Sequence, residues 1–228
     1  MKTALVITIA ITGLLLSGCK KEEKVGTVNA KTSPSEVTPK SFGREAEKDI
    51  LEMRRLANQA KIKITAAKTQ TAFIQWAGAI TRFKQVYGFY PNIGAAYDSS
   101  RDSVHLLDNP ATNLKFVKAL SGKLPTGIPL SAEDRKRLNK NGEEFCDFQQ
   151  GDFDDLANLA ERSMLVDGFG NSKIRVILDT DNNTTIRNIQ ANDLPEEISA
   201  AATDGGINAR VIIYSKGENG APDIVAIQ

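Results

Sequence analysis

Apolar and polar residues alternate with a helical period over the longest regular stretch of the chain, from Arg44 to Tyr87. Its first half carries many charged side chains, so we expect this half to project and the second half to pack in a core. Gly88 and Pro91 predict where the helix ends, because glycine suits a C-terminal cap and proline cannot continue a helix. The second half repeats apolar residues at the spacing that gathers them on one helix face: Ala66, Phe73, Trp76, Ala77, Ile80, Phe83 and Tyr87.

Two shorter helices are predicted from their caps. Asn109 followed by Pro110 is typical of a helix start, because the asparagine side chain accepts from free N–H groups and proline suits the first helical position. Gly122 ends this helix, and its apolar face consists of Leu114, Val117 and Leu120. A capping serine predicts a further short helix over Ser131–Leu138.

The C-terminal part of the chain has the pattern of β-strands. Three segments are rich in β-branched or aliphatic residues and are separated by polar turns: Ser172–Asp179, Ala209–Ser215 and Ile224–Ile227. We therefore predict an α+β domain, in which a long N-terminal helix packs on a small antiparallel sheet and one or two short helices lie between them in sequence.

The N-terminus carries one continuous apolar run, from Ala4 to Leu16, behind the positive charge of Lys2. The run is short for a membrane span and ends in small residues, which indicates an export signal that is removed. Leu16-Ser17-Gly18-Cys19 resembles the lipobox of bacterial lipoproteins. The resemblance implies cleavage before Cys19 and attachment of the lipid, palmitate included, to that residue. An ordinary secretory signal or an uncleaved anchor is the alternative.

These patterns divide the chain into three parts. Residues 1–18 are the expected signal peptide, and residues 19–43 are the lipidated cysteine and a tether rich in Ser, Thr, Pro and Lys. Such a tether has too few large apolar residues to offset the entropy of ordering. Residues 44–228 are the expected folded domain. Lys20 stands where some Gram-negative bacteria use aspartate to retain lipoproteins in the inner membrane, which favours the outer membrane.

Three motifs of the domain occur in the order found in one family. The end of the long helix, the entry to the sheet and the last turn read Ile80-x-x-Phe83-Lys84-x-x-Tyr87-Gly88-Phe89-Tyr90-Pro91, Asp167-Gly168-Phe169-Gly170-Asn171, and Ser215-Lys216-Gly217-Glu218-Asn219-Gly220 with Asp223-Ile224. This order resembles the periplasmic domains of type II secretion pseudopilins and type IV pilin-like proteins. The resemblance covers about Ala66 to Ile227 and implies a non-catalytic subunit of secretion or pilus machinery.

The N-terminus departs from that family. Pilins and pseudopilins keep an uncleaved apolar helix that anchors the subunit and packs the core of the filament. Here a cleaved lipoprotein signal occupies that place, and the helix that follows begins with polar residues. We therefore expect an accessory or divergent role at a membrane surface. The first half of the helix, Arg44–Lys63, is either a solvated stalk or a docking surface for another envelope protein.

Composition excludes several other classes. The formal net charge of +1 and the lack of basic clusters argue against nucleic-acid binding. Cys146 is the one cysteine besides Cys19, so it has no intrachain partner and we expect it to be a small packed residue. His105 is the only histidine, and we expect it in a loop, with no nucleophile motif around it. We expect no catalytic residues.

One cation site is a hypothesis with an alternative. Side-chain oxygens at alternate positions, as in the calcium loop of an EF-hand, are supplied by Asp179, Asp181 and Asn183. Thr184 replaces the glycine of that loop and Gln190 its bidentate glutamate, and a plain Asx-stabilised turn explains the same residues. The pseudopilin resemblance implies a second possible calcium ligand, Asp223, in the loop before the final strand.

The expected function is therefore that of a bacterial envelope lipoprotein that works through protein contacts in secretion or pilus-like machinery. The alternative is a lipid-anchored module that binds an extracytoplasmic ligand on a pilin-like scaffold, with calcium as a possible requirement. The expected partners are the membrane, through the lipid on Cys19, and secretion-system or pilus proteins.

Overall fold

The computed structural model describes residues 40–94, 102–154, 159–160, 162–187, 195–201, 205–218 and 220–228. The chain divides into two compact units, Met1–Ala46 and Glu47–Gln228. Of the first unit only the beginning of a helix is described, and Cys19 lies outside the described residues. All that follows concerns the second unit. No helix among the described residues has the length and apolar character needed to cross a membrane.

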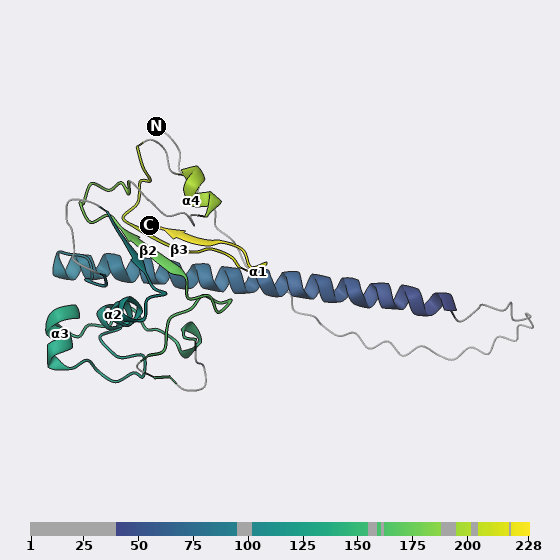
Figure 1. Ribbon diagram of the computed structural model, residues 1–228, viewed down its shortest axis with the longest axis horizontal. Helices are drawn as coiled ribbons and strands as arrows, with labels where there is room; N and C mark the ends of the chain where they lie inside the picture. The colour runs from purple at the N-terminus through teal and green to yellow at the C-terminus, as the bar shows by residue number, and fades with distance from the viewer. Residues whose placement is uncertain are drawn as a thin grey trace, which may run out of the picture. The chain divides into compact units, whose positions relative to one another are not determined.

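Helix α1 runs from Lys40 to Tyr87 and changes character along its length (Figure 1). Every described side chain from Glu47 to Ile64 is exposed. The second half is packed, and its fully buried large side chains are those that the sequence predicted: Phe73, Trp76, Ile80 and Phe83. Gly88 follows with φ +81° and donates its N–H to Lys84 O at 2.8 Å, as expected of a C-terminal cap.

The sheet has four antiparallel strands in the order of the sequence, β1 (Ser103–Leu106), β2 (Ile174–Leu178), β3 (Val211–Ser215) and β4 (Ile224–Ile227). The last three lie within the predicted segments. β1 was not predicted. It pairs with β2 so that Ser103 lies opposite Leu178. The first strand of the sheet thus comes before the short helices in the chain.

Both faces of the sheet are covered (Figure 1). On one face Val176, Leu178 and Ile213 pack in a cluster with the buried side of α1. On the other face the side chains of Ile177, Ile212 and Tyr214 pack with those of Ile186, Ile198 and Ile207. Ile198 belongs to α4 (Glu196–Ala201), a six-residue helix that the sequence did not indicate. Because strand residues alternate between faces, this second layer explains why every residue of β3 is buried.

Helices α2 (Pro110–Ser121) and α3 (Ala132–Leu138) follow β1 in the chain, and a 3-10 turn, η1 (Gln150–Asp152), comes after them. The predicted caps are confirmed. Asn109 Oδ1 accepts from the N–H groups of Ala111 and Thr112, and Gly122 adopts φ +67°. The predicted face of α2 was wrong in one position. Leu114 is only half-buried, and the buried face includes Phe116 instead. The centroid of the Phe116 ring lies 5.9 Å from that of the Trp76 ring.

The predicted fold class is thus confirmed at the level of architecture. The chain has an α+β fold, with a long helix and a four-stranded antiparallel sheet.

Candidate functional site

The turn after β2 is held by its own polar side chains. Asp179 Oδ1 accepts a hydrogen bond from the backbone N–H of Asn183, and Asp179 Oδ2 accepts one from Thr184, both at 3.0 Å. Asn183 Nδ2 donates to Asp181 Oδ2 at 2.7 Å. These are the bonds of an Asx-stabilised turn, so the turn conformation has a sufficient cause in its own hydrogen bonds.

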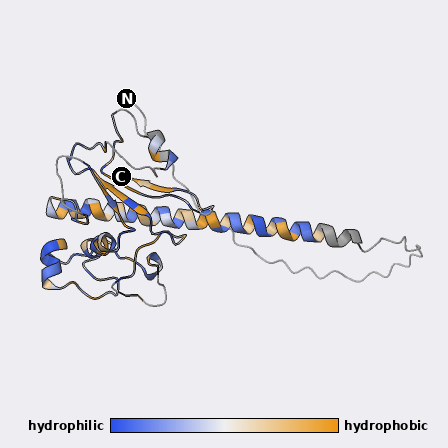
Figure 2. Cartoon of the chain, in the orientation of Figure 1, coloured by the Kyte–Doolittle hydropathy of each residue, from blue (hydrophilic) through white to orange (hydrophobic). Residues whose placement is uncertain are grey.

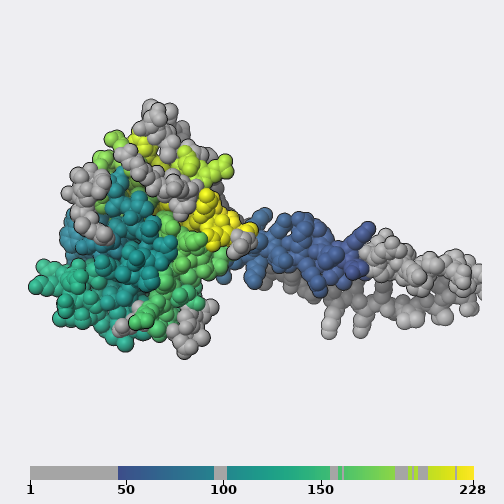
Figure 3. Space-filling model, in the orientation of Figure 1, coloured from purple at the N-terminus to yellow at the C-terminus, as the bar shows by residue number. Residues whose placement is uncertain are grey.

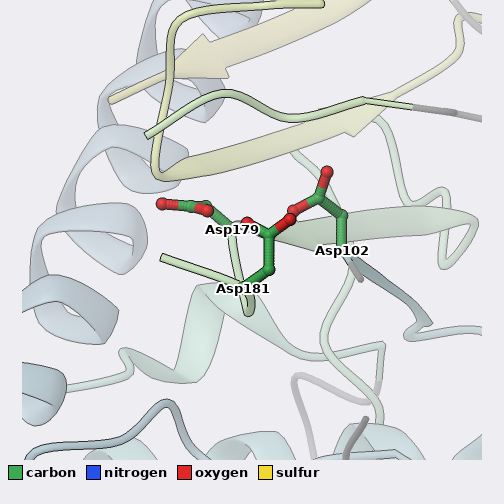
Figure 4. A group of neighbouring side chains, drawn as sticks. All are labelled: Asp102, Asp179 and Asp181. Carbon is green, nitrogen blue, oxygen red and sulfur yellow. The ribbon is translucent and has the colours of Figure 1, made fainter. Parts of the chain in front are cut away.

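A third carboxylate comes from a distant part of the chain. Because β1 and β2 are antiparallel, Asp102, directly before β1, lies beside Asp179, directly after β2. Each of Asp102, Asp179 and Asp181 offers an oxygen, and these three atoms lie within 4.8 Å of one another (Figure 4). We call these three residues the aspartate cluster.

The aspartate cluster is electrostatically unfavourable on its own. Burial is the main cause that raises the pKa of Asp179, and the hydrogen bond with Asp181 raises it further. Burial also raises the pKa of Asp102, and the charges of Asp181 and Asp179 act in the same direction. Two positive charges oppose this effect, since Lys84 lowers the pKa of Asp179 and Arg187 lowers the pKa of Asp102. The Lys84 ammonium lies 4.0 Å from the centre of the Tyr90 ring.

Two observations fit a cation at the aspartate cluster. Asp102 Oδ2 accepts from the N–H of Arg187 at 2.6 Å, whereas Asp102 Oδ1 is buried without a hydrogen-bond partner in the described part of the chain. Thr184, at the position that is glycine in an EF-hand loop, has φ +64°. A β-branched residue in the left-handed region is strained by about 1–2 kcal/mol, so the backbone at this one position suits the glycine of a calcium loop better than threonine.

The other predicted ligands are placed differently. The Asn183 side-chain oxygen accepts from Thr185 N–H at 2.7 Å, so it points back into the turn. Asp223 lies at the other end of the sheet, next to Ile224, which pairs with Ser215. Its Oδ1 accepts from Gly217 N–H at 2.8 Å and closes the loop before β4. The structure therefore does not bring Asp223 together with the aspartate cluster. Gln190 lies outside the described residues.

The Asp167–Asn171 motif has a structural role at the entry to β2. The buried Asp167 carboxylate accepts from the N–H groups of Phe169 and Asn171 and from the hydroxyl of Ser215, at 2.8 to 3.0 Å. Gly168 donates its N–H to Thr69 Oγ1 at 2.9 Å. A Cβ at Gly168 would come within 2.5 Å of that oxygen, so only glycine allows this close approach to α1.

His105 and Cys146 both lie in surroundings that disfavour their charged forms. His105 lies in β1 rather than in the loop expected for it, and its burial lowers the pKa of the imidazole to about 4. Its Nε2 is 3.0 Å from Ser103 Oγ, but Gly94 packs so closely on Nδ1 that a Cβ there would lie at 2.4 Å. No carboxylate could therefore approach Nδ1 from that side to orient the ring. Cys146 is buried, which raises the pKa of its thiol to about 12.

Two surface grooves flank α1 near the Asp167 loop. One, of about 300 Å³, is lined by residues that include Ile62, Phe169 and Glu218, and the other, of about 380 Å³, includes Lys68 and Asp152. Both lie at the lower end of the volumes that small-molecule sites have.

Asp102 is the one member of the aspartate cluster that sequence reasoning missed. The signal that could have found it is the strand beside it. A prediction of β1 as a neighbour of β2 would have placed the residues at their adjoining ends together.

Comparisons with known proteins add no identification. No protein-family model matches the chain, and the searches of curated proteins and of solved structures find no match.

Proposed function

We propose that this chain is a lipid-anchored protein of the bacterial cell envelope that works through protein contacts, as an accessory or divergent component of type II secretion or type IV pilus-like machinery. The Cys19 lipid would hold it on the membrane, with the outer membrane favoured, and the folded unit would carry the contacts. No catalytic step is part of the proposal.

The exposed half of α1 is the observation that carries this proposal. From Glu47 to Ile64 the helix makes a long surface on which all side chains are exposed, although several of them are large and apolar. Figure 3 shows one face of this part of α1. Leu51 is 59% exposed and Met53 is 61% exposed. An isolated helix of this kind is marginal in water, so such a surface is typical of one that another protein covers.

The residues behind the pilin resemblance also support the proposal, because they occupy structural junctions. Tyr87 and Gly88 end the long helix, the Asp167 loop fixes the entry of β2 against that helix, and Asp223 closes the loop before the last strand. The pilin-like character that we propose for the folded unit rests on these residues and on the order of helix and sheet.

Affinity capture from the native envelope tests this function. The tagged full-length chain should recover pilin-like or secretion-system subunits, and a variant with Met53→Asp and Ile64→Asp should lose them. Glu133→Lys with Arg137→Glu, on exposed positions of α3, is the matched control and should keep them. Recovery of no such subunit by the native chain contradicts the machinery proposal. Labelling with a palmitate analogue should be lost with Cys19→Ser, and a wild-type chain that takes up no label contradicts the lipid anchor.

The alternative function, a calcium-dependent binding module, is favoured by the aspartate cluster. We propose that the cluster binds one Ca²⁺, since an oxygen of each of the three carboxylates converges there, and since Asp102 Oδ1 is buried with no hydrogen-bond partner among the described residues. Three carboxylates suit a divalent cation. Lys84 opposes it by its charge, so the expected affinity is that of a weak extracellular site, with a dissociation constant of about 0.1–1 mM.

Thermal unfolding in calcium or in a chelator tests this second proposal. Calcium at about ten times its dissociation constant should stabilise the folded unit by about 1.4 kcal/mol. Lys84→Gln should increase this shift, because it removes the competing charge. A melting temperature that is equal in 5 mM calcium and in chelator excludes the site.

A further inference from the structure

The exposed side of α1 carries a stripe of seven apolar residues and one threonine with a seven-residue repeat. Its members follow one another at alternating spacings of three and four residues: Ile50, Met53, Ala57, Ala60, Ile64, Ala67, Thr71 and Ile74. All eight are exposed, and the large ones are 46–61% exposed, Ile50 the least and Met53 the most. Figure 2 shows the apolar residues of this half of α1 among hydrophilic ones. We call these eight residues the heptad stripe.

The heptad stripe lies opposite the face of α1 that packs in the core. At 100° per residue, the mean direction of its members lies about 170° from the mean direction of Thr69, Phe73 and Trp76, which are buried. The two faces overlap in sequence, because Ala67, Thr71 and Ile74 stay exposed beside those buried residues. A partner on the heptad stripe therefore approaches α1 from the side away from the core, and beside Thr71 it comes near β4, because Gln70 Nε2 donates to Val225 O at 3.2 Å.

The spacing indicates what kind of partner fits. Apolar residues that repeat every 3.5 positions keep facing a second helix along a left-handed supercoil, whereas a globular surface imposes no such period. The heptad stripe extends for about 36 Å along the helix. If two such stripes cover each other they bury roughly 1,200 Å² in total, the lower bound for a specific interface.

We propose that Ile50–Ile74 of α1 forms a parallel, in-register, two-stranded coiled coil with the same segment of a second copy of this chain. This inference rests on the proposed lipid anchor, because two chains held on one membrane surface by Cys19 enter the pair in the same direction. It deepens the proposed function by naming one partner of the exposed half of α1.

Charges beside the heptad stripe give this register one attractive and one repulsive contact. In the heptad abcdefg, the a positions are Ile50, Ala57, Ile64 and Thr71, and the d positions are Met53, Ala60, Ala67 and Ile74. In a parallel pair the residue before an a position faces the residue five places later on the other helix. Asp49 then faces Arg54 of the second copy, which is attractive. Lys63 faces Lys68 of the second copy, which is repulsive. The ion pair between Glu52 and Arg55, at 2.5 Å, lies on the outer side and is left intact.

The composition of the heptad stripe predicts a weak pair that membrane attachment strengthens. Ala57, Ala60 and Ala67 bury little area each, so the large residues at the two ends contribute most of the stabilisation. Attachment of both chains to one surface raises their effective concentration. We therefore expect dimers in the envelope and a monomer–dimer equilibrium in detergent.

Cysteine cross-linking of the full-length chain in the envelope tests orientation and register. Met53→Cys and Ala60→Cys, both at d positions, should each give a disulfide-linked homodimer on mild oxidation. Asn58→Cys, on the outer side of the same turn, should give none, and neither should the wild type, in which Cys146 is buried. An antiparallel pair can join at most one of the two d positions to itself. Cross-linking at one or neither therefore overturns the inference.

Sedimentation of the lipidated chain in detergent tests the interface itself. Met53→Asp should weaken dimerisation at least tenfold, whereas the control Leu51→Asp, equally exposed but off the heptad stripe, should leave it unchanged. Lys63→Glu should strengthen it about twofold to threefold, since the Lys63–Lys68 repulsion becomes an attraction. A monomer at every concentration, or equal effects of Met53→Asp and Leu51→Asp, overturns the inference. Palmitate labelling of the same samples reads the anchor separately, so a failed coiled coil and a failed lipoprotein assignment are distinguishable.

Discussion

Removing one charge from the aspartate cluster should stabilise the protein when no cation is present. Two unit charges 4.8 Å apart repel by about 3.5 kcal/mol at an effective dielectric constant of 20. Asp102 and Asp181 are partly exposed, and solvent screening reduces this to a net effect of about 1–2 kcal/mol. Asp102→Asn keeps an acceptor for the N–H of Arg187 and loses the charge. We expect a higher free energy of unfolding and a melting temperature higher by about 3–6 °C in chelator.

Calcium should stabilise the wild type more than it stabilises Asp102→Asn. The wild type should gain about 1–2 kcal/mol in 5 mM calcium, whereas Asp102→Asn should gain little, because it has lost a charged ligand. Urea unfolding in chelator and in calcium measures both effects. Glu133→Gln, which removes a charge from an exposed position of α3, is the control and should change neither. The reasoning is refuted if Asp102→Asn is less stable than the wild type in chelator, or if calcium shifts both proteins equally.

Three further outcomes follow from local geometry. Gly168→Ala should destabilise the fold by about 2–3 kcal/mol in urea unfolding, because its Cβ would meet Thr69 Oγ1 at 2.5 Å, whereas Gly151→Ala, with open space around it, should change little. His105 has a pKa near 4 in the folded protein and 6.5 when unfolded, so the unfolded state takes up the proton first and stability falls from pH 6.5 to 4, by up to about 3 kcal/mol. His105→Gln should remove this part of the pH dependence, and equal pH profiles would contradict the burial argument. Thr184→Gly should be neutral or stabilising in thermal unfolding despite the entropy that glycine adds to the unfolded state, and a clear loss would show that the left-handed backbone is not strained.

Elements with local causes were predictable from the sequence, and elements with distant causes were not. The start of α2 depends on Asn109 and Pro110, which are adjacent to it, and its end on Gly122. β1 has four residues and forms because β2 offers a partner. α4 has six residues and is held by the burial of Ile198 under the sheet.

The same distinction applies to the sites. The turn bonds of Asp179 could be predicted because they lie within five residues, whereas the contribution of Asp102 required the register of two strands. The heptad stripe was visible in the sequence, but the stronger period of the aromatic core face, from Phe73 to Tyr87, directed the prediction to the opposite side of the helix.

Because α1 is continuous, the angle between its heptad stripe and its core face is fixed. The same backbone carries the heptad stripe on one side and the core residues on the other, with no proline in the helix and with Gly78 beyond the last residue of the stripe. Each residue of helix between them corresponds to 100° of rotation and 1.5 Å of rise. A partner that binds the heptad stripe therefore also fixes the direction in which the sheet faces, because one continuous helix carries both.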